Sequence, residues 1–278
     1  MNFIRLSLFL YVALLTLVCN SDSRQCFTDD LLTGTQQSNG TIPDLLTPGS
    51  YQIIARYPHD TSAFTQGLVF YKDNLFESTG LLDKSGVRKV NFNSGKVLLK
   101  TQLPDIYFGE GLVLLNNQLI QMSWKSGKVF FFQPETLKLI KRQRIEKNVW
   151  GSTVINGNLL LSDGSSNLFF IDSENLSINK TLKITINNKE LSGLNELEYV
   201  KGYVYANVWP TSCVVKIDPV SGNVVDWFDL SKLYPTDYQL SDSAVLNGIA
   251  YHKQKNHFFV TGKFWLYLYE INLQFNDD

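Results

Sequence analysis

Polar side chains with chemically useful groups lie at corresponding points of a repeated pattern in this chain of 278 residues. Gln66, Glu110 and Asn195 lie in turns that lead into short apolar strands, and Lys263 lies at a strand end of the last repeat. A buried carboxylate costs free energy unless it is paired or hydrogen-bonded. Side chains of these types can exchange protons or stabilise developing charge. Facing one axis together, they would form a site rather than a core.

The turns return at intervals of 41 to 52 residues, measured along Gln66, Glu110, Gly151, Glu196 and Gly248. Each turn precedes a short apolar strand, a polar hairpin tip and a second strand. A period of about 40–50 residues built from short strands is typical of a β-propeller blade. We therefore predict an all-β fold, a five-bladed β-propeller whose turns meet around one central axis.

Aromatic residues accompany the polar ones. They lie in the first two turns and at strand ends or turns of three successive repeats, namely Phe64, Phe108, Trp124, Trp150 and Trp209. This arrangement predicts an aromatic cage around the polar groups. The pattern alone equally allows the tryptophans to pack between blades, and it allows Glu110 and Lys263 to form a salt bridge on the axis.

Composition favours a folded domain and argues against several classes of protein. Hydrophobic residues make up 44% and charged residues 18%, so a sizeable core is available. The net charge of −1 and the lack of a basic stripe argue against a nucleic-acid partner. The histidines, His59, His252 and His257, lack the close spacing of a zinc motif, and we expect the last two to be solvated beside a hairpin tip. Neither a Gly-x-Ser-x-Gly elbow nor a phosphate-binding Gly loop is present in the sequence.

The first segment, residues 1–23, is predicted to be a cleaved signal peptide. Arg5 supplies a positive charge, and the thirteen-residue apolar run over residues 6–18 is short for a membrane span. We therefore expect the mature chain in the lumen of the secretory pathway or outside the cell, with no membrane partner after cleavage. A signal anchor is the alternative interpretation.

Beyond that segment we expect an irregular lead over residues 24–50 and a propeller domain over residues 51–278. The strand-like stretch Tyr51-Gln52-Ile53-Ile54-Ala55-Arg56-Tyr57 precedes the first repeat. Pairing of this strand with the last blade would close the ring and remove the exposed sheet edges. A closed ring needs no partner at its edges, so we expect a monomer. The irregular stretch over residues 230–246 is expected to carry a short helical turn.

Cysteines and glycosylation sequons fit an exported chain. Cys19 would leave with the signal peptide, and Cys26 and Cys213 would remain as an even pair in an oxidising compartment. We predict a Cys26–Cys213 disulfide, with two separate buried thiols as the alternative. Three sequons are possible glycan acceptors, at Asn39, Asn175 and Asn179.

Six strings, in order and at the intervals of the repeats, carry a resemblance to a known family. The chain resembles the plant and bacterial type of glutaminyl cyclase, a secreted five-bladed propeller. The strings are Phe64-Thr65-Gln66-Gly67-Leu68, Glu77-Ser78-Thr79-Gly80, Tyr107-Phe108-Gly109-Glu110-Gly111-Leu112, Leu194-Asn195-Glu196-Leu197-Glu198-Tyr199, Val245-Leu246-Asn247-Gly248-Ile249-Ala250 and Thr261-Gly262-Lys263.

The resemblance implies a glutaminyl-peptide cyclotransferase, which converts the N-terminal glutamine of a peptide or protein to pyroglutamate and releases ammonia. By the matching motifs, Glu110 would shuttle the proton, while Lys263 and Asn195 would hydrogen-bond the side-chain amide oxygen. Gln66 would help to hold the amine or the amide. No catalytic metal or other cofactor is implied, and a structural calcium ion in the channel is left open. The pocket wall would consist of Phe64, Phe108, Trp124, Trp150 and Trp209.

One departure from the family pattern and two other functions need testing. Members often continue Thr-Gly-Lys as Leu-Trp-Pro, whereas this chain reads Phe264-Trp265-Leu266, so the strand end at Lys263 could be held less rigidly. A propeller that only binds a peptide or sugar would keep the aromatic cage without needing these polar residues together. A metal-dependent propeller hydrolase could use Glu110, Glu196 and Asn195 as ligands.

Overall fold

The computed structural model describes residues 26–27, 31–33, 46–236 and 240–275 of the chain. The predicted signal peptide and the sequon at Asn39 lie outside the described residues. Within these ranges, none of the helical structure has the length and apolar character needed to cross a bilayer. Asn175 and Asn179 are exposed in the third blade, so both sequons can be reached, and their occupancy stays a prediction.

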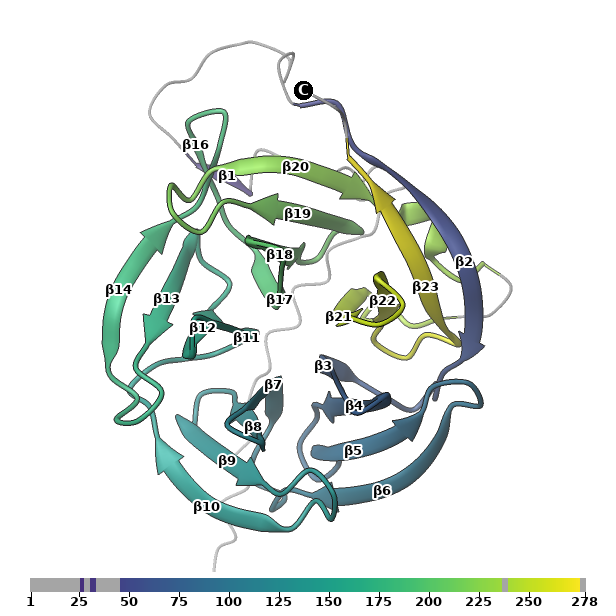
Figure 1. Ribbon diagram of the computed structural model, residues 1–278, viewed down its shortest axis with the longest axis vertical. Coiled ribbons are helices and arrows are strands. Elements are labelled where there is room, and N and C mark those ends of the chain that lie inside the picture. Colours follow the sequence, from purple (N-terminus) through teal and green to yellow (C-terminus); the bar gives the residue numbers. More distant parts are fainter. Residues whose placement is uncertain (1–25, 28–30, 34–45, 237–239, 276–278) are drawn as a thin grey trace, which may run out of the picture.

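Five four-stranded antiparallel sheets stand around a central axis as the blades of a propeller (Figure 1). The innermost strands are β3 (Thr65–Tyr71), β7 (Gly109–Leu115), β11 (Ser152–Ile155), β17 (Leu194–Val200) and β21 (Leu246–His252). The second strands are β4 (Asn74–Thr79), β8 (Gln118–Ser123), β12 (Asn158–Ser162), β18 (Tyr203–Val208) and β22 (His257–Gly262). The third strands are β5 (Gly86–Asn91), β9 (Lys128–Phe132), β13 (Asn167–Ile171), β19 (Cys213–Ile217) and β23 (Tyr267–Gln274). The outermost strands are β6 (Lys96–Gln102), β10 (Leu139–Arg144), β14 (Ile178–Lys183), β20 (Val224–Asp229) and β2 (Ser50–Pro58).

The ring is closed by the N-terminal strand, as predicted. β2 pairs antiparallel with β23 from Ser50 opposite Gln274 to Pro58 opposite Tyr267, and Figure 1 shows the two strands side by side at the edge of the last blade. The last blade therefore combines strands from both ends of the described chain. The predictions of a five-bladed all-β propeller and of its mode of closure are confirmed.

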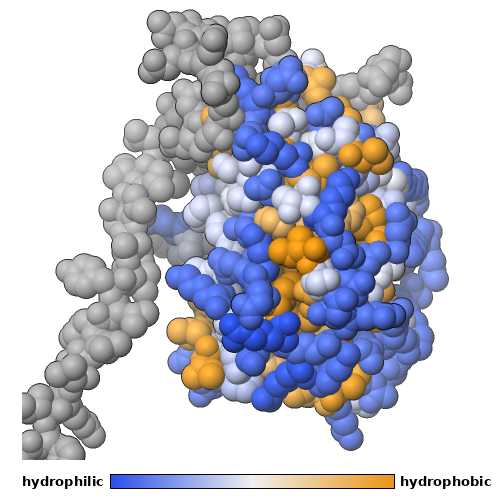
Figure 2. Space-filling model, turned by 90° about the vertical axis from the view of Figure 1, so that its left-hand side faces the viewer, coloured by the Kyte–Doolittle hydropathy of each residue, from blue (hydrophilic) through white to orange (hydrophobic). Residues whose placement is uncertain are grey.

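Burial falls from the axis to the rim, as the residue patterns require. In the second strands almost every side chain is buried, because neighbouring blades cover both faces of the sheet. The outermost strands β10 and β14 are mostly exposed. Figure 2 shows the side of the ring that carries β14, where hydrophilic residues predominate and apolar residues form separate patches.

Glycines in the repeated turns allow neighbouring blades to approach closely at the axis. A Cβ atom at Gly151 would overlap the backbone carbonyl oxygen of Asn195, and one at Gly67 would lie 2.6 Å from the Leu112 nitrogen. Because backbone atoms cannot give way as a flexible side chain can, glycine is required there. The repeated glycines thus set the spacing of the innermost strands.

Two small elements lie outside the blades. The helical turn expected over residues 230–246 is present as the short 3-10 helix η1 (Ser231–Leu233). A three-stranded sheet formed by β1 (Leu32–Thr33), β16 (Lys189–Leu191) and β15 (Thr185–Ile186) was not predicted. Its strands are only two or three residues long, too short for a periodic pattern to indicate them.

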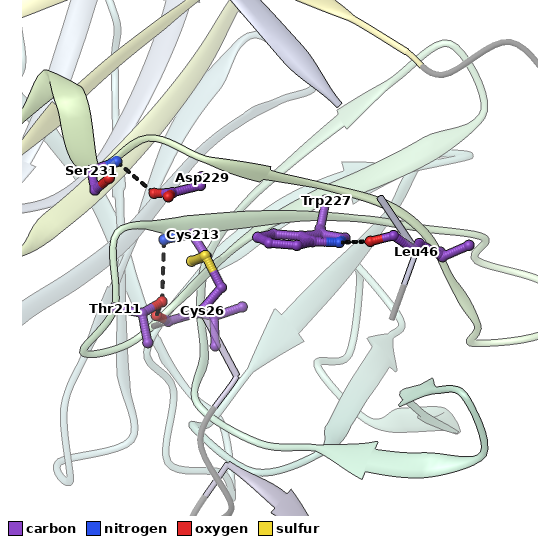
Figure 3. Close-up of a disulfide and its surroundings, with 8 residues drawn as sticks. Cys26, Leu46, Thr211, Cys213, Trp227, Asp229 and Ser231 are labelled. Carbon is purple, nitrogen blue, oxygen red and sulfur yellow. Dashed lines mark hydrogen bonds between the residues drawn. A yellow bond between two sulfur atoms is a disulfide. The ribbon is translucent and has the colours of Figure 1, made fainter. Parts of the chain in front are cut away.

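A disulfide fastens the N-terminal lead to the fourth blade (Figure 3). Cys26 and Cys213 are bonded, with their Cα atoms 5.4 Å apart, which confirms the predicted pair. Next to it, the Phe27 ring meets the Trp227 ring edge-on at 5.0 Å between centroids. The Trp227 indole nitrogen donates to the Leu46 carbonyl oxygen at 2.5 Å. The lead is therefore tied to the blade by covalent, aromatic and hydrogen-bonding contacts.

Replacing both Cys26 and Cys213 by alanine is expected to lower the free energy of unfolding by about 2–4 kcal/mol, since the bridge closes a loop spanning 187 residues of sequence separation. Urea unfolding of the two proteins measures the difference. Reduction of the wild-type protein should reproduce the change, and the double variant should then be insensitive to reductant. Equal unfolding midpoints would contradict a stabilising role for the bridge.

Candidate active site

The predicted site residues gather at the end of the central axis where the innermost strands begin. Gln66, Glu110 and Asn195 are each the second residue of an innermost strand, in β3, β7 and β17. Lys263 lies in the turn that follows β22. The ring arrangement brings these starting points together around the axis (Figure 1). Residues separated by up to two hundred positions thus share one mouth of the propeller.

A register irregularity turns these polar side chains out of the strand ladder. In β3, β7, β17 and β21 the pairing with the second strand shifts at the start, between Thr65 and Gly67 in β3 and between Leu194 and Leu197 in β17. A bulge re-aims a side chain that would otherwise lie in the regular alternation. The innermost strand of the third blade, β11, pairs without a shift, and it supplies none of the predicted catalytic residues.

Glu110 and Lys263 are buried, with 4% and 5% of their surface exposed. The backbone carbonyl of Glu110 accepts a hydrogen bond from Ser78 in the neighbouring blade, and the Lys263 ammonium lies over the Phe64 ring, 4.6 Å from its centroid. No described residue donates to the Glu110 carboxylate, and no ion pair joins it to Lys263. The axial salt bridge that the pattern allowed is therefore absent from the described part of the chain.

Burial shifts the pKa values of Glu110 and Lys263 toward each other. It raises the pKa of the Glu110 carboxyl well above its ordinary value, with the Lys263 charge acting in the opposite direction. Burial also lowers the pKa of the Lys263 ammonium to about 8, and the Glu110 charge opposes that shift. A buried carboxyl group and a buried amine whose pKa values are displaced in opposite directions are typical of groups that exchange protons in catalysis.

The two predicted amides differ in how they are held. Asn195 is 3% exposed, and its side-chain oxygen Oδ1 has no partner among the described residues. Its backbone carbonyl accepts from the Ser162 hydroxyl at 2.6 Å, which fixes the strand start. Gln66 Oε1 instead accepts from Asn247 Nδ2 at 3.0 Å, and the same nitrogen donates to the Thr65 carbonyl at 2.9 Å. Gln66 is thus oriented, whereas Asn195 is left available.

Asn247 is a site residue that the sequence reasoning missed. It is the second residue of β21 and so corresponds to Gln66, Glu110 and Asn195 in their strands. The repeat had been aligned on Gly248 instead, which has a backbone φ of +122°. Aligning the turns on the residue that enters the strand would have identified Asn247 from sequence.

The predicted aromatic wall consists of two groups. Phe64 and Phe108 meet edge-on at 5.8 Å between centroids, and Phe108 and Trp124 do so at 5.7 Å. Trp150 and Trp209 form a second edge-on pair at 5.6 Å. Trp209 remains 40% exposed, so it is not a packing residue within the core.

Phe264 extends the first aromatic group. Its ring lies 5.3 Å from that of Phe64, and it was missed because it differs from the usual family residue at this point. The next residue, Trp265, is fully buried and donates its indole hydrogen to the Ala244 carbonyl. Adjacent aromatic residues therefore play different parts, one in the wall and one in the core.

Glu196 braces the blades instead of facing the mouth. It is fully buried, and its carboxylate oxygens accept from the backbone nitrogens of Ile249 at 2.8 Å and Leu68 at 3.4 Å. These contacts link the fourth blade to the fifth and the first. Both carboxylate oxygens of Glu196 thus already have backbone partners, unlike the free metal ligand that the alternative of a metal-dependent hydrolase would require. In the described ranges, three thiol, imidazole or carboxylate ligand atoms come close enough to share a metal only at Cys26, Cys213 and Asp229, where the two sulfurs form the disulfide.

A cavity of about 380 Å³ lies at the opposite end of the axis, where the innermost strands finish. Its lining includes Glu198, whose pKa burial raises to about 8, and His252. His252 is 5% exposed and packs against the Phe70 ring at 4.7 Å, so the expectation that it is solvated is wrong. The apolar surface of the neighbouring blade covers it. None of the predicted site residues lines this cavity.

Fold and site together define a class of protein, a five-bladed propeller with a buried acid, amine and amides at one end of its axis. A model of the glutamine cyclotransferase family matches residues 28–273. A glutaminyl-peptide cyclotransferase of Arabidopsis thaliana is 39% identical over 245 residues, which are 86% of this chain and 76% of that protein. The crystal structure of Myxococcus xanthus glutaminyl cyclase matches with a TM-score of 0.78 and 33% identity, over 83% of this chain and 100% of that chain. The protein belongs to the glutamine cyclotransferase family.

Replacing Glu110 by glutamine is expected to lower the pKa of the Lys263 ammonium further below about 8, because the Glu110 charge now opposes the effect of burial. An NMR titration of lysine side-chain signals measures this, with Lys263→Met to assign the signal. Glu198→Gln, at the other end of the axis, is the matched control and should leave the titration unchanged. A Lys263 pKa that stays in place in the Glu110 variant would show that the two groups are not coupled.

The double variant Glu110→Gln/Lys263→Met is expected to be more stable than wild type at neutral pH by about 1–4 kcal/mol, because buried charges without direct partners cost more than neutral groups of similar size. The wild-type protein should gain stability as pH rises from about 8 toward 10.5, since unfolded Lys263 then binds more protons than folded Lys263. The difference between the two proteins should therefore shrink over that range. Thermal unfolding at several pH values tests this, and a less stable double variant at neutral pH would contradict it.

Proposed function

We propose that the protein is a glutaminyl-peptide cyclotransferase. It acts on peptides or proteins with an N-terminal glutamine, converts that residue to pyroglutamate and releases ammonia. In chemical terms it is an aminoacyltransferase that moves an acyl group within one substrate. The observation that carries the proposal is a set of buried polar side chains at one mouth of the propeller that have no hydrogen-bond or ion-pair partner among the described residues, Glu110, Lys263 and Asn195.

Unpaired buried polar groups point to a ligand that completes them. Each such group loses its hydrogen bonds to water on folding. The free energy lost in this way is recovered only when a ligand binds and supplies new hydrogen bonds. A glutamine side-chain amide and a neighbouring amine offer a complementary set of donors and acceptors. A propeller that merely packed aromatic residues around its axis would have no need of a carboxylate, an ammonium group and a carboxamide in the same place.

The proposed reaction begins when the neutral α-amine of the substrate attacks the carbon of its own side-chain amide. Glu110 accepts the proton that the attacking nitrogen loses and returns it to the departing nitrogen, so the carbon–nitrogen bond breaks and ammonia leaves. The raised pKa of the Glu110 carboxyl suits this exchange, because burial makes the group a stronger base than an ordinary carboxylate.

Lys263 and Asn195 act on the amide oxygen. As the amine attacks, negative charge develops there, and the Lys263 ammonium and the Asn195 amide hydrogens stabilise it. Both side chains are buried, and neither the Lys263 ammonium nor the Asn195 amide hydrogens make a hydrogen bond or ion pair with a described residue, so they need little rearrangement when the charge appears. Gln66, oriented by Asn247, holds the substrate amine or amide in line for attack. These residues supply the stabilisation themselves, so the proposed mechanism needs no catalytic metal ion, and a structural calcium ion in the channel stays a prediction.

The aromatic wall favours ring closure in two ways. It excludes water, which strengthens the few polar contacts inside the site. It also keeps the flexible glutamine side chain folded on itself, so that amine and carbonyl remain within reach of each other. The edge-on arrangement of Phe64, Phe108 and Trp124 supplies a rigid apolar surface for that purpose.

The disulfide supports the proposal that the protein acts in an oxidising compartment, in the secretory pathway or outside the cell. A signal peptide and glycosylation at the exposed sequons belong to the same proposal. Ring closure through β2 and β23 protects the sheet edges within one chain, which supports a monomer.

The proposal predicts that the purified chain releases ammonia from a dipeptide that begins with glutamine, and that an excess of chelator leaves the rate unchanged. Glu110→Gln should lower kcat by about 100- to 10,000-fold, because the proton shuttle is removed. Glu198→Gln, which changes a half-buried carboxyl at the far end of the axis, is the control and should retain wild-type kcat. Coupled detection of ammonia measures all four conditions.

Two outcomes would overturn the proposal in different ways. Ammonia release that the chelator abolishes would transfer the chemistry to a metal ion. Absence of release by the folded wild-type chain would leave a propeller that binds a ligand without transforming it.

A further inference from the structure

His59 occupies a buried position that the proposed mechanism does not use. It follows β2, in the connection from the last strand of the fifth blade to the first strand of the first blade, and it is 7% exposed. Its ring nitrogen Nδ1 lies 2.8 Å from the carbonyl oxygen of Trp265, and Nε2 lies 3.1 Å from Oε1 of Glu77. The ring thus bridges two segments from different blades.

Both partners of the ring are hydrogen-bond acceptors. A carbonyl oxygen cannot donate, and the Glu77 carboxylate already accepts from Thr65 Oγ1 at 2.7 Å and from Arg88 Nε at 2.8 Å. Burial acts to raise the pKa of Glu77, but the charges of Arg88 and His59 outweigh it and hold that pKa below its ordinary value. Glu77 is therefore ionised. For both ring contacts to be hydrogen bonds, each ring nitrogen must carry a hydrogen, which only the imidazolium form of the ring provides.

Other charges around the ring balance this cation. Arg88 is shared between Glu77, at 2.7 Å, and Asp60, at 2.6 Å. With His59 as an imidazolium, the cluster would hold two cations, His59 and Arg88, and two anions, Glu77 and Asp60. These charges have opposite charges as direct partners, whereas Glu110 and Lys263 do not. Paired buried charges of this kind fix the positions of the segments that carry them.

The segment held by His59 carries Lys263. Trp265 stands two residues beyond Lys263, and the backbone nitrogen of His59 also donates to the Leu266 carbonyl at 2.8 Å. Phe264, which stands between Lys263 and Trp265, donates its backbone nitrogen hydrogen to the Ala63 carbonyl at 2.7 Å. The connection over residues 59–63 is thus hydrogen-bonded to three successive residues of the turn after β22, Phe264, Trp265 and Leu266.

The same connection also leads to the ring on which the Lys263 ammonium rests. Phe64 directly follows Ala63, and the ammonium lies over the Phe64 ring. The turn Lys263-Phe264-Trp265-Leu266 contains no proline, so no proline ring stiffens it. Hydrogen bonds from the connection must therefore supply the rigidity.

We propose that His59, as an imidazolium that bridges the Trp265 carbonyl and the Glu77 carboxylate, is a positioning residue for Lys263. Its importance for turnover rests on the proposed function, because Lys263 acts there on the amide oxygen in the transition state. His59 touches neither substrate nor reacting atoms. It acts by holding the turn after β22 at the distance from Glu110 that the reaction needs.

Two variants separate the two contacts of the ring. In His59→Asn the short amide can donate at the place of Nδ1, so the bond to Trp265 is kept and that to Glu77 is lost. In His59→Gln the longer amide can donate at the place of Nε2, so the bond to Glu77 is kept and that to Trp265 is lost. His252→Asn, which changes an equally buried histidine at the other end of the axis, is the control.

Steady-state ammonia release and thermal unfolding of all four proteins test the proposal. We expect His59→Gln to lower kcat roughly 10- to 100-fold with little change in KM, since a misplaced Lys263 loses transition-state stabilisation and the aromatic wall is intact. His59→Asn should retain most of kcat, even if both variants lose stability equally. Equal kcat in the two His59 variants, or wild-type kcat in folded His59→Gln, would overturn the positioning role.

NMR makes the test independent of turnover. The nitrogen-15 spectrum of wild-type His59 should show two protonated ring nitrogens at neutral pH, and the side-chain signal of Lys263 should shift in His59→Gln but not in His59→Asn. A neutral His59 ring, or a Lys263 signal unchanged in both variants, would contradict the proposal. If the folded wild type released no ammonia, the proposed function would fail, while these spectra would still decide whether His59 positions Lys263.

Discussion

The structure depends on the antiparallel pairing of β2 with β23. This pairing joins the two ends of the propeller, so the fifth blade stands beside the first. Only then can Lys263, from the fifth blade, rest on Phe64, from the first. Without closure, β23 would become the unpaired edge of a three-stranded blade, and the fifth blade would not be held beside the first. Closure therefore protects the fold and assembles the site in one step.

The free-energy cost of burying polar groups without partners falls on the residues at the axis, and the packing of the rest of the ring offsets it. Glu110 and Lys263 are buried without direct charged partners, and their pKa values are displaced accordingly. Glu77, by contrast, is paired with Arg88, which helps to hold its pKa below the ordinary value, whereas Glu196 accepts hydrogen bonds from backbone nitrogens although burial still raises its pKa. The contrast is physical, because satisfied charges stabilise a single arrangement whereas unsatisfied ones keep their capacity for a ligand.

Sequence reasoning succeeded where a signal was local or repeated and failed where neighbouring blades decide the environment. The recurring turns predicted the propeller, and the even pair of cysteines predicted the disulfide. His252 was expected to be solvated because it borders a hairpin tip, yet the adjoining blade buries it. Asn247 was missed because the last repeat was aligned on Gly248, one residue beyond the position that corresponds to Gln66 and Glu110.

The sequence by itself determined the number of blades, the order of the turns and the kinds of side chain that meet at the axis. These follow from the repeat period and from glycines and polar residues at corresponding positions, which are properties of the chain alone. Only the tertiary structure decided which polar groups are paired and which are left free. Glu110 and Glu196 are both glutamates of the repeated turns, yet backbone nitrogens of two other blades satisfy Glu196 and none of the described residues satisfies Glu110. The reason is that burial and hydrogen bonding are set by neighbours distant in sequence, and these become neighbours only when the ring closes.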